Sequence, residues 1–132
     1  MTLRWLLVAS AFLALPALAD CESGPTRIRA EGRALSIAFT TQPAPIKVGE
    51  LFSLEATLCP KAGASAVRAF KVDASMPDHR HGMNYQPSVV RSGENSYTAS
   101  GLMFHMPGRW QLVFEVDSAG GRERILVDYF LD

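Results

Sequence analysis

Alternation of apolar and polar side chains limits the fold of this chain more than any other feature of its sequence. After residue 33 such stretches dominate, and no stretch long enough for a helix repeats with the helical period. In residues 52–58, for example, Phe, Leu, Ala and Leu alternate with Ser, Glu and Thr. A strand of this kind buries one face and exposes the other, as strands of antiparallel sheets do. The sequence therefore predicts an all-β fold.

Turn residues divide this alternating region into short strands. Pro and Gly interrupt it at residues 42–45, 92–95 and 117–121. The strands are expected at residues 35–39, 52–58, 67–74, 89–90, 96–102, 110–116 and 124–131. About seven short strands without internal repeats or a linker are typical of an antiparallel immunoglobulin-like β-sandwich. Residues 20–132 are predicted to form this single domain, with Trp110 in its core.

The first 19 residues have the character of a secretory signal peptide. Arg4 precedes the uncharged, mostly apolar residues 5–19, which end in Ala-Leu-Ala. As a helix this stretch would span about 23 Å, less than the roughly 30 Å of a bilayer core, so a stable membrane anchor is not expected. A lipoprotein is an alternative because of Cys21, although Asp20 before it fits lipid attachment poorly. We therefore expect a mature chain that begins at Asp20 and resides in the periplasm.

Export decides how the two cysteines are interpreted. In an oxidising compartment Cys21 and Cys59 are expected to form a disulfide that ties the N-terminus to the end of a strand. The alternative is a thiolate metal site, but neither cysteine has a second one two residues away.

Other function classes find little support in the composition. Thirteen Lys and Arg balance thirteen Asp and Glu, so the basic excess of a nucleic-acid-binding protein is absent from the sequence. The sequence contains no Gly-x-Ser-x-Gly motif, no recognisable Ser, His and Asp triad, and no Gly-rich turn followed by a helix to bind phosphate. We expect that the protein is not an enzyme.

Histidine and methionine are concentrated in one quarter of the chain. All three histidines, and every methionine except the initiator, lie between residues 76 and 106. Imidazole nitrogen and thioether sulfur together are ligands for copper, with thioether selecting Cu(I). Zinc favours cysteine or carboxylate beside histidine, and calcium needs a cage of oxygens. The pattern indicates a copper site.

The candidate ligands fall into two groups. In the first, His79, His81 and Met83 would share one face of an extended chain, while Pro77 and Gly82 favour a shaped loop. Met76 begins this segment and is a further candidate.

The second group is His105 and Met106. Adjacent residues on a straight strand point to opposite faces, so both reach one metal only if Pro107 and Gly108 bend the chain. Met103 beside them is expected to pack in the core as a gap-filling residue.

Three further residues near these groups have structural or supporting interpretations. Asp78 is either a hydrogen-bond acceptor for an imidazole or a solvated surface residue. Arg80 is expected to be exposed, and Tyr85 either caps the site or packs.

These two motifs resemble a known family. Residues 76–83, Met-Pro-Asp-His-Arg-His-Gly-Met, and later Met-Pro-Gly-Arg-Trp at 106–110 are similar to the motifs of the YtkA-like/FixH-like family of exported or membrane-anchored β-sandwich domains. The resemblance covers residues 67–116 and implies copper handling and the assembly of copper-containing oxidases. It places Met76, His81 and Met83 on the first motif and Met106 on the second. His79 and His105 are additional imidazoles in this chain.

The sequence thus predicts a periplasmic copper-binding carrier or chaperone. Its partners would be copper, as Cu(I) or Cu(II), and a copper-receiving membrane oxidase or another copper protein. An immunoglobulin-like accessory module of a membrane complex, without metal, is the alternative, and a zinc- or nickel-binding protein is a third interpretation.

Overall fold

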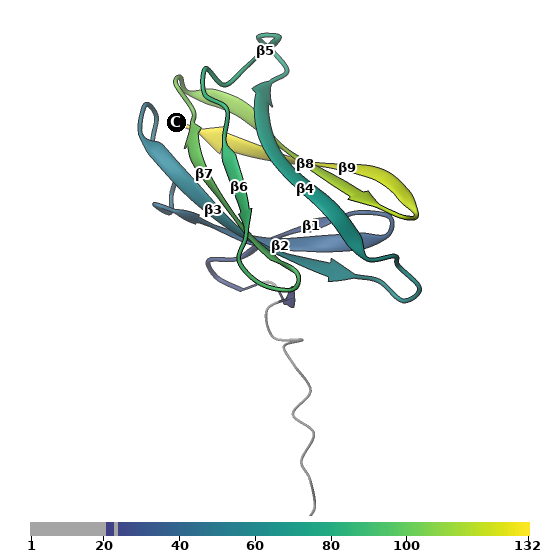
Figure 1. The fold of residues 1–132 in the computed structure, drawn as a ribbon. Helices are drawn as coiled ribbons and strands as arrows, with labels where there is room; N and C mark the ends of the chain where they lie inside the picture. Colours follow the sequence, from purple (N-terminus) through teal and green to yellow (C-terminus); the bar gives the residue numbers. More distant parts are fainter. Residues whose placement is uncertain (1–20, 23) are drawn as a thin grey trace, which may run out of the picture.

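The computed structural model describes residues 21, 22 and 24–132, which form nine β-strands joined by turns and loops (Figure 1). The strands are β1 (Ile28–Glu31), β2 (Leu35–Gln42), β3 (Leu51–Pro60), β4 (Val67–Met76), β5 (His81–Gly82), β6 (Ser88–Arg91), β7 (Ser96–Met103), β8 (Gly108–Ser118) and β9 (Gly121–Leu131). Within these described residues no helix has the length and apolar character needed to cross a membrane. The expected signal peptide, residues 1–19, lies outside the described part of the chain.

The strands form two antiparallel sheets that face each other. One has the order β1-β2-β3-β7-β6 and the other β5-β4-β8-β9. The arrangement of β2-β3-β7-β6 against β4-β8-β9 is the strand order of a constant-type immunoglobulin domain. The expected all-β, antiparallel sandwich is therefore confirmed, with nine strands in place of about seven.

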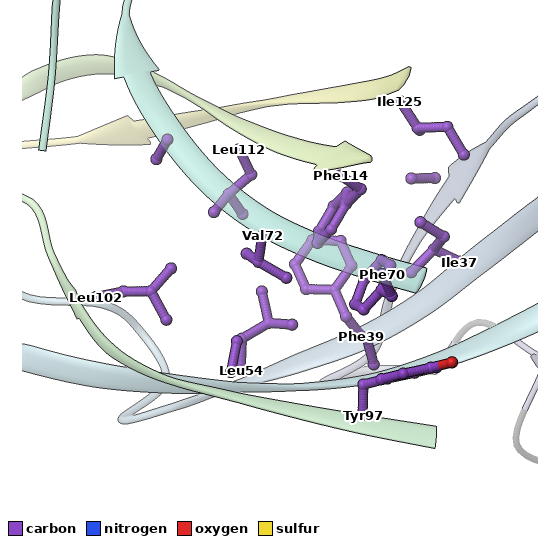
Figure 2. Packing of buried hydrophobic residues seen from close by; sticks show 14 of the residues in the cluster. Ile37, Phe39, Leu54, Phe70, Val72, Tyr97, Leu102, Leu112, Phe114 and Ile125 are labelled. Atoms are coloured by element: carbon purple, nitrogen blue, oxygen red, sulfur yellow. The ribbon is translucent and has the colours of Figure 1, made fainter. Parts of the chain in front are cut away.

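Aromatic side chains from both sheets fill the core. Phe39 of β2 lies 5.2 Å from Phe114 of β8, measured between ring centroids, and Phe70 of β4 stacks on Phe114 at 5.9 Å (Figure 2). Trp110 is fully buried, as its position at the start of an alternating strand predicts. Alternation along β8 puts Trp110 and Phe114 on the inner face, which explains why this strand carries so much of the core.

Cys21 and Cys59 form the expected disulfide, with 5.8 Å between their Cα atoms. Cys59 lies near the end of β3, so the bond fastens the N-terminal residues to the five-stranded sheet. This is inconsistent with the thiolate-ligand interpretation, because both sulfurs are used in the bridge.

One end of the sandwich brings together both histidine-containing segments. Here β4 ends and β8 begins, and β5 lies beside the last two residues of β4, at the top of Figure 1. The end of β7 lies here too, because only residues 104–107 separate it from the start of β8. Met103 of β7 pairs with Leu51, so β3 also begins at this end. We call this the histidine end. Cys59 lies eight residues along β3 from Leu51, about 27 Å away at the usual rise of a strand.

Candidate metal centre

A tight turn and a two-residue strand carry the first two histidines. The chain turns at residues 77–80, where the backbone N–H of His79 donates to the carbonyl of Met76 at 3.1 Å and Arg80 takes a positive φ of 58°. The chain then returns along β4, so that His81 pairs with Met76. Directly opposite residues of paired strands share a face, which puts His81 on the same face as the buried Met76. The expected loop is present and is shaped by this turn.

The third histidine lies on the bend between β7 and β8. Phe104 stacks on Trp110 with 4.6 Å between ring centroids, and the carbonyl of Phe104 accepts the backbone N–H of Gly49 at 2.8 Å. The indole N–H of Trp110 donates to the carbonyl of Met106 at 2.9 Å. These contacts fix the backbone on both sides of His105. The predicted bend is observed at residues 106–107.

The three imidazoles lie next to one another in a row. Ring centroids are 5.8 Å apart for His79 and His81, and 5.1 Å apart for His81 and His105. A metal–nitrogen bond of about 2 Å puts an ion about 3 Å from the ring centroid, so two rings sharing one ion have centroids about 5–6 Å apart. Both neighbouring pairs fall in this range. Nevertheless, nowhere in residues 21, 22 and 24–132 do three His, Cys, Asp or Glu side chains already stand in position to hold one ion.

The hydrogen bonds of the rings indicate which nitrogens are available. The Nδ1 of His81 lies 3.0 Å from the carbonyl oxygen of Gly82, which can only accept; Nδ1 therefore donates, and in the neutral ring Nε2 is the nitrogen with the lone pair. The Nδ1 of His105 is buried, yet it has no hydrogen-bond partner among the described residues. Buried polar atoms are nearly always paired, so this nitrogen calls for a partner that the polypeptide does not supply.

The methionines of the histidine-containing segments lie at different depths. Met76 is fully buried, while Met83 and Met106 are half-buried and pack against the core. The prediction that Met103 packs in the core is wrong, since Met103 is half-exposed. Alternation along β7 turns Leu102 inward and therefore turns Met103 outward.

An ion-pair network fastens the turn at residues 77–80 to β8 and β9. Arg109 of β8 binds both carboxylate oxygens of Asp78, through Nη2 at 2.7 Å and Nε at 3.0 Å, and its Nη1 reaches Asp128 of β9 at 3.3 Å. Hydrogen bonding by Arg109 holds the pKa of Asp78 below its ordinary value, and the charge of nearby His79 lowers that pKa further. Asp78 is thus exposed, as one interpretation expected, but its carboxylate is occupied.

Sequence reasoning missed two residues that contact the histidine-containing segments. Trp110 was assigned to the core alone, but its indole also lies edge-on to His105 at 5.2 Å and to His81 at 6.0 Å. Arg109 was not considered, because no local signal links residues 78 and 109. Arg80 is exposed as expected, and Tyr85 is about half-exposed at 49%.

Gly108 lets the chain enter β8 directly beneath the site. Its φ is +121°, and a Cβ there would lie 3.0 Å from the Cε of the buried Met76. Gly108→Ala is therefore expected to lower the free energy of unfolding by about 1–3 kcal/mol, measured by urea denaturation. Gly82→Ala is the control: its nearest contact is an ordinary 3.4 Å, so a change within about 0.5 kcal/mol is expected. Equal effects of the two substitutions would contradict this explanation.

Comparison of the chain with family models, curated proteins and solved structures finds no match.

Proposed function

We propose that the mature protein is a periplasmic copper-binding carrier that holds its ion at the histidine end through His79, His81 and His105. The observation that carries this proposal is the buried, unpartnered Nδ1 of His105, whose ring lies 5.1 Å from the ring of His81. A metal ion bound by that nitrogen would supply the missing partner. His81 supports the same interpretation, since its Nδ1–H donates to a backbone carbonyl as in many metal-binding histidines, leaving Nε2 to bind.

Methionine thioethers decide which metal this site favours. Met83 and Met106 are half-buried beside the histidines, and Met76 lies on the same inner face as His81. Imidazole accepts copper in either oxidation state, while a thioether favours Cu(I). We propose that Met83 completes the site, with Met76 or Met106 as a further ligand.

The position of the site suits a carrier. His79 is exposed and His81 half-exposed, whereas His105 has a buried nitrogen. An incoming ligand can therefore displace the outer histidines first, which a closed four-ligand structural site does not allow. The recipient is proposed, from the family resemblance, to be a copper-receiving membrane oxidase or another copper protein.

The test is copper binding by the chain that begins at Asp20, in which Trp110 is the only tryptophan. Cu(II) quenches nearby tryptophan fluorescence, so titration is expected to quench Trp110 with a one-to-one endpoint, and Cu(I) binding is measured by competition with a chromogenic chelator. Replacing His79, His81 and His105 together by alanine is expected to abolish both signals. Tyr85→Ala, on the same segment but about half-exposed, is expected to retain them.

Two results would overturn the proposal. Unchanged copper stoichiometry in the triple alanine variant would remove the site from these residues. Failure of the wild-type chain to bind either copper ion would instead favour the metal-free accessory module, and displacement of copper by Zn(II) or Ni(II) in competition would favour those metals.

A further inference from the structure

We propose that Arg109 is a metal-specificity residue, which holds the Asp78 carboxylate away from the histidines so that the site offers nitrogen and sulfur ligands only. This inference rests on the proposed copper function and names what sets its selectivity. It concerns a side chain that would bind no metal itself.

Asp78 is the carboxylate that the chain places directly beside one of the proposed ligands, His79. Between residues 75 and 109 the chain has two acidic residues, Asp78 and Glu94. Glu94 lies in the turn joining β6 to β7, where Asn95 binds Leu58 near the disulfide, at the opposite end of the sandwich. Asp78 directly precedes His79, on the turn that carries it.

Arg109 donates a hydrogen bond to each oxygen of this carboxylate. The guanidinium meets both oxygens of Asp78, the fork-to-fork geometry that makes arginine–carboxylate pairs directional. Arg109 is itself held from the other side, since Asp128 accepts from its Nη1 at 3.3 Å and from the Nε2 of Gln111 at 3.0 Å. The Arg109 side chain is 28% exposed against 57% for Asp78, so the ion pair joins an exposed carboxylate to a better-buried guanidinium.

A released Asp78 carboxylate would change the kind of ion that the site prefers. Zinc is bound well by carboxylate oxygen together with histidine nitrogen, whereas Cu(I) is soft and gains little from a hard oxygen. Loss of Arg109 also leaves a net negative charge beside the histidines, which favours a divalent over a monovalent ion. Both effects shift the preference from Cu(I) toward Zn(II).

The experiment measures the dissociation constants of Cu(I) and Zn(II), by competition with chelators, in variants of the chain that begins at Asp20. For Arg109→Gln we expect the ratio of zinc affinity to copper affinity to rise about 10-fold, the scale on which residues outside the ligand shell tune metal sites. Asp78→Asn breaks the same ion pair without releasing a carboxylate and makes the local charge more positive, so its ratio is expected to stay at or below the wild-type value. The double variant Asp78→Asn/Arg109→Gln is expected to return to that value.

Each outcome decides the matter. A similar zinc shift in Asp78→Asn, or a shift that persists in the double variant, would mean that a loosened turn causes the effect, and would overturn the role of Arg109. An unchanged ratio in Arg109→Gln would overturn it as well. If Arg109→Gln does not fold, Arg109→Lys, which keeps the charge but loses the fork, must still raise the ratio. Copper binding by the wild type is measured alongside, and its absence would reject the proposed function itself.

Discussion

Replacing Phe114 by alanine is expected to lower the free energy of unfolding by about 3–5 kcal/mol, because it opens a cavity where the two sheets meet. Phe114 is fully buried, and its ring contacts Phe39 of the facing sheet and Phe70 of its own. The substitution therefore removes buried apolar area and two aromatic contacts at once (Figure 2). A small domain has only about 5–15 kcal/mol of stability in total, so the variant should stand near the limit of folding.

Urea denaturation followed by circular dichroism gives this difference, and Phe130→Ala supplies a matched control. Phe130 lies on β9, is 70% exposed and undergoes the same chemical change. We expect its stability to change by no more than about 0.5 kcal/mol. A loss of similar size in both variants would show that Phe130 is covered in solution and that exposure does not separate core from surface here.

Alternation predicted the strands where one face is buried and failed where burial is slight. β3 and β8 are long, and every second side chain of each faces the core, so their sequences show the pattern clearly. β1 was missed because only Ala30 of its four residues is buried, and four residues are too few for alternation to stand out. β5 has two residues, His81 and Gly82, which is too short for any periodicity. These two strands account for the difference between about seven and nine.

The composition of the candidate site was readable in the sequence, but its geometry was not. Histidine and methionine cluster in the sequence, and the fold brings the two histidine-containing segments to one end of the sandwich. That His81 lies beside His105 follows from two separate facts, namely that β5 folds back on β4 and that β7 delivers its last residues to the same end. Neither fact has a local signal in the sequence.

The ion pair between Arg109 and Asp78 likewise could not be predicted from the sequence. Asp78 was expected to be solvated or to accept from an imidazole, since those are the partners within a few residues. The structure gives it a partner 31 positions away, because the turn after β4 lies beside the start of β8. Long-range ion pairs of this kind require the register of the strands, and the register is set by the whole core.

Loss of the disulfide is expected to cost about 4 kcal/mol, the chain entropy released when the loop that the bridge closes becomes unrestricted in the unfolded state. Cys21 and Cys59 are 38 positions apart, and the loop between them contains β1, β2 and most of β3. The double variant Cys21→Ala/Cys59→Ala is compared with the wild type by urea denaturation under oxidising conditions.

Reducing the disulfide in the wild-type chain distinguishes the stability that comes from the covalent bridge from the stability that comes from packing of the cysteine side chains. Cys59 is only 8% exposed, so alanine there also leaves a small cavity, whereas the thiol-reduced wild-type chain keeps both side chains. We expect the reduced chain to lose slightly less stability than the double variant. Reductant should not affect the double variant, because it has no cysteine. Because the bridge lies at the opposite end of β3 from the histidines, copper affinity of the folded chains should be the same in all of them. A loss below about 1 kcal/mol on reduction would contradict the loop-closure explanation and would mean that the unfolded chain already keeps this segment compact.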